Sequence, residues 1–117
     1  MDKLVNFWKE TIRVLEIHNK TWDDVEFICD SDANISKSNF ENVAKNTNYD
    51  NGFGGQRIAS DLMIVGSDWW LERHEYDGSE WWEFKKTPRR FDNTKKVARF
   101  DGGCWETLSE INREKEY

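Results

Sequence analysis

The sequence has little cysteine, histidine and proline, and it contains no long hydrophobic run. Its two cysteines, Cys29 and Cys104, lie far apart in the chain, which indicates reduced thiols rather than a framework of disulfides. No apolar segment approaches the length that crosses a bilayer. The first residues, MDKLVNFWKE, lack the basic segment and apolar stretch of a secretory signal. These absences predict a cytoplasmic protein that does not enter a membrane.

Tryptophan and charge are abundant by contrast. Seven of the 117 residues are Trp, and aromatic residues make up 15% of the chain, a share that argues against disorder. Hydrophobic residues reach 37% and charged residues 34%. A chain of this length and composition can bury a core beneath a highly polar surface. We therefore expect one folded domain over residues 1–117.

The net charge of −6 is divided into separate blocks along the chain. Residues 61–83 hold seven acids and one base, whereas residues 85–99 hold seven bases and one acid. A third block, residues 23–32, has acids and no base. The acidic blocks suit a basic partner and disfavour DNA, while the basic block does the reverse. A solvated face that keeps a small protein in solution is the other explanation for each block.

The hydrophobic pattern predicts three helices. Residues 3–18 carry apolar side chains near helical spacing, and Asp2 is available as the N-cap. Residues 38–46 predict a second helix, in which Ser38 begins a capping box. Residues 106–115 predict the third.

Short β-prone runs predict the strands of a sheet. They lie at residues 25–30, 61–66 and 97–101, and alternation in the first run places Cys29 on the core face. We expect an α+β fold, in which a small mixed or antiparallel sheet is centred on residues 61–86. A Trp-rich β-hairpin lies at its centre, and about three helices pack against it.

The stretch EYDGSEWWEFKK, residues 75–86, predicts a hairpin with its turn at YDG. We expect a three-residue loop with Gly78 in the left-handed conformation, a register that pairs His74 with Glu80. A two-residue loop would instead set carboxylates against each other, Glu75 facing Glu80, and like-charge pairs destabilise a hairpin.

Adjacent tryptophans in a strand point to opposite faces of the sheet. Either helices cover both faces, or some of the indoles stay at the surface, where Trp is enriched among binding hot spots. In the expected register Trp69 and Trp81 share one face. The candidate partner-binding surface consists of this pair and the charged residues around it: Trp69, Arg73, Glu75, Asp77, Glu80, Trp81 and Glu83.

A metal site and catalysis are the alternatives to partner binding. The ligand set of one tetrahedral zinc could come from two histidines and two cysteines, His18, Cys29, His74 and Cys104. None of these residues has the close spacing that is typical of zinc motifs. A small metal-dependent enzyme would use His74 together with Glu72 or Glu75. No nucleophile motif is present, so we assign no catalytic residue.

Nucleic-acid binding is the third hypothesis, and it depends on the basic segment 85–99. Aromatic residues flank the bases there, as in nucleic-acid readers. The acidity of the whole chain opposes direct contact with nucleic acid.

Residues 21–88 resemble small proteins encoded by phages and prophages of Gram-positive bacteria. The resemblance depends on TWDDVEFI, NYDNGFGGQRIASDLMIVG and WWLERHEYDGSEWWEFKKTP, with a weaker match in GCWETLSEIN. Within it, the string YDGSEWW is distinctive, but it specifies no activity.

Small acidic phage proteins of this kind include the type II-A anti-CRISPR proteins, which bind the RNA-guided Cas nuclease and block its loading or its target DNA. By this analogy we expect a non-enzymatic inhibitor of a bacterial defence nuclease that acts through protein–protein contact. The acidic hairpin and its indoles would occupy a basic, DNA-handling surface of the nuclease.

Overall fold

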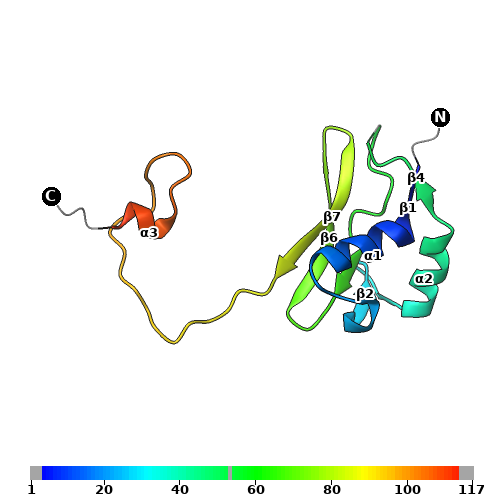
Figure 1. Cartoon of the computed structure of the whole chain (residues 1–117), viewed down its shortest axis with the longest axis horizontal. Coiled ribbons are helices and arrows are strands. Elements are labelled where there is room, and N and C mark those ends of the chain that lie inside the picture. Colours follow the sequence, from blue (N-terminus) through cyan, green and yellow to red (C-terminus); the bar gives the residue numbers. More distant parts are fainter. Residues whose placement is uncertain (1–3, 53, 114–117) are drawn as a thin grey trace. The chain divides into compact units, whose positions relative to one another are not determined.

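The computed structural model describes residues 4–52 and 54–113 of the chain. It divides into two compact units, residues 1–87 and residues 88–117, where the sequence predicts a single domain. Figure 1 shows the chain coloured from its N-terminus in blue to its C-terminus in red. No helix in the described part of the chain is both long enough and apolar enough to cross a membrane.

The first unit has an α+β fold, as the sequence predicts. Its main sheet is antiparallel and has five strands in the order β3-β2-β5-β6-β7. Two further strands, β1 and β4, form a separate antiparallel pair. The strands are β1 (Val5–Asn6), β2 (Phe27–Cys29), β3 (Asn34–Ile35), β4 (Asn48–Tyr49), β5 (Met63–Val65), β6 (Trp69–Tyr76) and β7 (Ser79–Lys86).

Both helices of the first unit begin at a side-chain cap. Helix α1 (Phe7–Ile17) starts after Asn6, whose side chain accepts the N–H of Lys9. The predicted cap, Asp2, lies outside the described residues. Helix α2 (Lys37–Lys45) starts after Ser36 rather than Ser38, because the extended backbone of Ser36 lets its hydroxyl accept the N–H of Asn39.

The core lies between the two helices and one face of the main sheet (Figure 1). Phe7 of α1 stacks on Trp82 of β7 with ring centroids 5.5 Å apart, and it lies 5.7 Å from Phe40 of α2. Ile28, Ile64 and Leu71 are fully buried beneath them. Because Ile28 points into this core, Cys29 points to the opposite face, and the predicted alternation of β2 is wrong by one residue.

The hairpin register differs from the predicted one. The turn has two residues, Asp77 and Gly78, both with positive φ (49° and 88°), as in the tight turn that matches strand twist. Glu75 therefore faces Glu80, and His74 faces Trp81.

Other partners offset the like-charge pairs that this register creates. Glu80 accepts the backbone N–H groups of Arg57 and Ile58 and pairs with Arg73. Across from Glu72, Glu83 accepts the indole N–H of Trp81. These partners are far from the hairpin in sequence or not evident from it, which is why the predicted loop length is wrong.

We expect Gly78→Ala to lower the free energy of unfolding by about 1 kcal/mol or more, because a side chain disfavours the left-handed backbone that the turn requires. An added Cβ would meet no atom closer than 3.5 Å, so the cost is conformational rather than steric. Urea unfolding measures it. Gly55→Ala is the matched control, since its Cβ meets nothing within 4 Å, and equal losses in the two variants would contradict this explanation.

Among its described residues, 88–113, the second unit contains one short helix, α3 (Leu108–Ile111), which Thr107 caps in a capping box with Glu110. Of the predicted helix 106–115, residues 114 and 115 lie outside the described part. The predicted strand at 97–101 is absent from this unit. The side chain of Asn112 instead binds the backbone there, accepting N–H groups of Ala98 and Arg99 and donating to the carbonyl of Arg99.

Candidate functional site

The face of the main sheet that points away from α1 and α2 is the candidate site, and we call it the outer face. Neither helix of the first unit covers it, because the core side chains of the same strands alternate to the opposite side. Its side chains include Phe27 and Cys29 from β2, Met63 and Val65 from β5, Trp70, Glu72 and His74 from β6, and Trp81, Glu83 and Lys85 from β7.

Hydrogen bonds to carboxylates fix both indoles of this face. Trp70 donates its indole N–H to Glu72 at 2.6 Å, and Trp81 donates its own to Glu83 at 2.7 Å. Each pair lies two residues apart on one strand, where side chains share a face. The rings are thus oriented before any partner arrives, which reduces the entropy that binding would cost.

Glu72 also contacts His74, whose Nε2 lies 2.6 Å from the second carboxylate oxygen. The hydrogen bond from Trp70 is the main cause that lowers the pKa of Glu72, and the contact with His74 adds to it. Glu72 therefore stays charged at neutral pH. This pair is also the part of the enzyme hypothesis that the structure brings together, although it lies on an open sheet face.

Exposed apolar surface and negative charge meet on this side of the hairpin. Phe27 is 42% exposed and Trp81 37% exposed. Beyond them, the tip of the hairpin presents Glu75 and Asp77, both exposed. With Glu72 and Glu83, the outer face and tip carry four carboxylates against one lysine, Lys85. Such a surface suits a basic protein partner with an apolar centre.

The structure separates the seven residues of the predicted partner surface. Trp69, Arg73 and Glu80 are buried on the helix side of the sheet, at 2%, 6% and 3% exposure. Trp81 and Glu83 lie on the outer face instead. The expectation that Trp69 and Trp81 share one face is therefore wrong, because the shorter turn moves every residue of β7 to the other side.

Two of the buried members, Arg73 and Glu80, belong to an ion network inside the first unit. Arg73 donates to Glu80 at 2.9 Å and to the hydroxyl of Tyr49 at 3.0 Å, and a longer contact of 3.4 Å joins it to Glu10. Tyr49 in turn donates to Glu10 at 2.5 Å. The Arg73 guanidinium also lies 4.9 Å from the ring centre of Trp82, a favourable cation–π distance.

This environment shifts two pKa values of the network. Burial, together with the hydrogen bond to Glu10, raises the pKa of Tyr49. Burial alone lowers the pKa of Arg73, but the hydrogen bond to Glu80 and the charge of Glu10 raise it overall. The tyrosine stays neutral and the arginine charged, and the geometry assigns both to holding the fold rather than to contact with a partner.

The structure does not bring the predicted zinc ligands together. His18 stacks on Phe84 at 4.0 Å on the helix side of the sheet, whereas His74 lies on the outer face. Cys29 is partly buried, and Cys104 belongs to the second unit. Within residues 4–52 and 54–113, no group of three or more His, Cys, Asp or Glu side chains could hold a metal ion.

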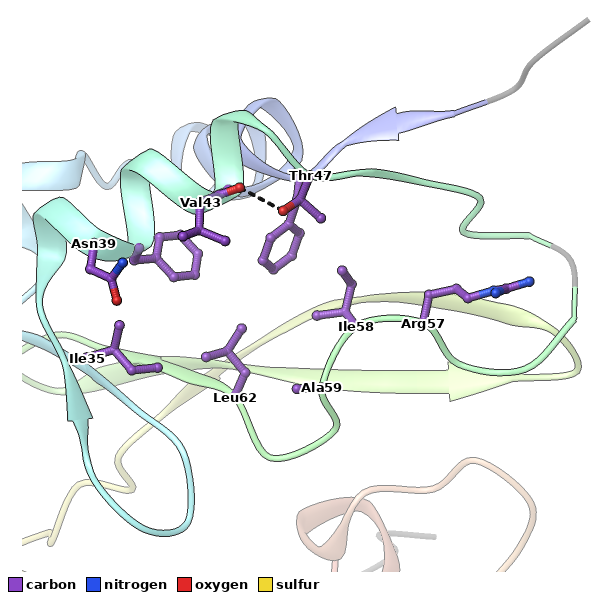
Figure 2. Close-up of a pocket in the computed structure, with 11 residues that line it drawn as sticks. Ile35, Asn39, Val43, Thr47, Arg57, Ile58, Ala59 and Leu62 are labelled. Atoms are coloured by element: carbon purple, nitrogen blue, oxygen red, sulfur yellow. Dashed lines mark hydrogen bonds between the residues drawn. The ribbon is translucent and has the colours of Figure 1, made fainter.

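An apolar cavity of about 320 Å³ lies between α2 and residues 57–62. In Figure 2, Val43, Ile58 and Leu62 point into it, while the guanidinium of Arg57 points away. No charged group is aimed at its interior, so the cavity offers packing space and no evident chemistry.

The basic segment 85–99 lies largely at the surface. All seven of its Lys and Arg residues are exposed, and Phe91 beside them is 76% exposed. Lys85 and Lys86 belong to β7, and the other five bases belong to the second unit.

Sequence reasoning missed Trp70 and Glu72 as members of the exposed face. The signal that would have found them is the Asp-Gly dipeptide at 77–78, which strongly favours a two-residue turn and so fixes which indoles point outward.

Comparison of the chain with protein-family models, curated proteins and solved structures finds no match.

Proposed function

We propose that the chain is a non-enzymatic binding protein whose outer face contacts a basic surface of another protein. The observation that carries this proposal is the pair of indoles, Trp70 and Trp81, held by carboxylates on a sheet face that α1 and α2 leave open. Trp is enriched among binding hot spots, and charged groups around it steer the encounter.

As the partner we propose a bacterial RNA-guided Cas nuclease, bound in the cytoplasm of an infected or lysogenic cell. Two features support this choice: the resemblance to small phage proteins, and the four carboxylates of the outer face and the hairpin tip. A nuclease binds DNA through lysine and arginine side chains, which this acidic surface would occupy. The protein would then block DNA loading in proportion to its amount, without turnover.

Trp81→Ala tests this proposal. We expect it to weaken binding to the purified nuclease–guide RNA complex by about 2 kcal/mol or more, roughly 30-fold, because it removes a hot-spot side chain. Calorimetry measures the affinity, and inhibition of DNA cleavage gives a second reading. Circular dichroism checks that the variant remains folded.

Phe91→Ala is the matched control, since it removes an exposed aromatic ring from the second unit. It should bind as tightly as the original chain. A nuclease that does not bind the original chain would overturn the choice of partner. Equal affinity of Trp81→Ala and the original chain would overturn the choice of surface.

A second candidate function is nucleic-acid binding through the segment 85–99. The observation in its favour is that all seven basic side chains are exposed, as are Phe91 and Phe100 in the same part of the chain. Such binding is dominated by phosphate contacts and weakens steeply as salt rises. A salt-dependent mobility shift of a DNA fragment by the chain alone would favour this second function over the first.

A further inference from the structure

Strand β7 is the long free edge of the main sheet. It stands at one end of the strand order, and its residues pair only with β6 among the strands described. The opposite edge, β3, has two residues, whereas β7 has eight. Long edge strands offer unpaired backbone groups to another chain, and natural proteins commonly cover or pair them.

Two hydrogen bonds show which backbone groups of β7 point away from the sheet. Thr87 donates its N–H to the carbonyl of Asp68, which precedes β6, so odd-numbered residues of this stretch face β6. Glu80 donates to Asn51, outside the sheet, so even-numbered residues face outward. The outward groups are thus the N–H and C=O of Trp82, Phe84 and Lys86.

This free edge has a defined length. Asn51 occupies the outward N–H of Glu80 at one end. At the other end Pro88 has no N–H to donate. Between them, no hydrogen bond to the outward groups of Trp82, Phe84 and Lys86 is formed by the described part of the chain.

The charges along β7 are complementary to those of β7 in a second copy of the chain, which we therefore take as the strand that pairs with this edge. Antiparallel pairing of two β7 strands is centred on one position. Centring on Glu83 or on Lys85 would set two like charges directly opposite each other, which destabilises a strand pair. Centring on Phe84 sets Glu83 of each copy opposite Lys85 of the other, which gives two pairs of opposite charges.

The Phe84-centred register also uses the free backbone groups. Phe84 would exchange two hydrogen bonds with its own counterpart, and Trp82 would pair with Lys86 of the other copy on both sides. We propose that two copies of the chain associate through β7 in this register and form one continuous sheet. The two outer faces then lie on the same side of that sheet.

A charge-reversal cycle tests the register. Light scattering should give the original chain a mass approaching twice 14.0 kDa as concentration rises from micromolar to millimolar. Glu83→Lys and Lys85→Glu should each shift the protein to the monomer, because each places like charges opposite one another twice. The double variant Glu83→Lys/Lys85→Glu restores opposite charges and should restore the dimer.

Amide hydrogen exchange measured at low and high concentration provides a second test. The amides of Trp82, Phe84 and Lys86 should become protected only at high concentration. The Glu80 amide, already bonded to Asn51, should be protected at both. A chain that remains monomeric at every concentration would overturn the proposal, as would dimers that both single reversals leave intact.

Discussion

Arg73→Met should lower the free energy of unfolding by about 3–5 kcal/mol, the cost of leaving a buried charge without its partner. The side chain of Arg73 is fully buried, and that of Glu80 is 2% exposed. Without the guanidinium, Glu80 keeps only the backbone N–H groups of Arg57 and Ile58. Tyr49 and Glu10 lose a shared donor at the same time. Urea or thermal unfolding measures the loss.

The exposed ion pair between Glu41 and Lys45 on α2 provides the control. Its N–O distance is 2.6 Å, shorter than the 2.9 and 3.4 Å of the two ion pairs that Arg73 makes, yet its side chains are 36% and 51% exposed. Lys45→Met should therefore change stability by no more than about 0.5 kcal/mol. Arg73→Lys should fall between the two, because an ammonium keeps the charge but lacks the fork that reaches several acceptors. Comparable losses for Lys45→Met and Arg73→Met would contradict the central role of the network.

Trp82→Ala should also cost about 3–5 kcal/mol, the range for removing a large aromatic side chain from a core. Trp82 is 4% exposed and stacks on Phe7, and Arg73 lies over its ring. Its indole N–H donates to the hydroxyl of Thr11, which is itself fully buried. Chemical denaturation followed by circular dichroism measures the change without relying on tryptophan fluorescence.

Trp81→Ala is the matched control for Trp82→Ala. Trp81→Ala removes the same side chain one position earlier, but from the outer face, where the ring is 37% exposed. It should cost less than about 1 kcal/mol, because little of its burial depends on the core. If the two variants lost equal stability, the outer face would be covered in solution, and Trp81 could not act as a free contact.

The sequence was sufficient to predict the fold class and the positions of most elements. Turn residues located the hairpin, a short apolar run located the strand β5, and helical spacing located α1 and α2 to within a few residues. These signals are local, because each depends on side chains a few positions apart. The predicted strand at 97–101 failed for the same reason: its backbone groups are bound by Asn112, which is more than ten residues away.

The candidate site was less accessible from sequence, because it depends on contacts between distant parts of the chain. Repulsion between the facing carboxylates of Glu75 and Glu80 disfavours the observed turn, unless other groups bind Glu80. Those partners, Arg57 and Ile58, lie more than twenty residues earlier. Trp81 and Glu83 were predicted at the surface and lie there, whereas Arg73 and Glu80 entered the core through contacts that no local pattern reveals.

The Arg73 network also bears on the order of events during protein synthesis. Glu10 and Tyr49 leave the ribosome before Arg73, but Glu80 follows it on the other side of the turn. A nascent chain that ends before β7 therefore has an arginine without its closest carboxylate, and it also lacks Trp82, the ring on which Phe7 stacks. Synthesis of β7 therefore supplies both the closest carboxylate of Arg73 and the ring on which Phe7 stacks. Helices α1 and α2 are translated much earlier than β7. The core between them and the sheet is complete only after the residues near the end of the unit have been translated.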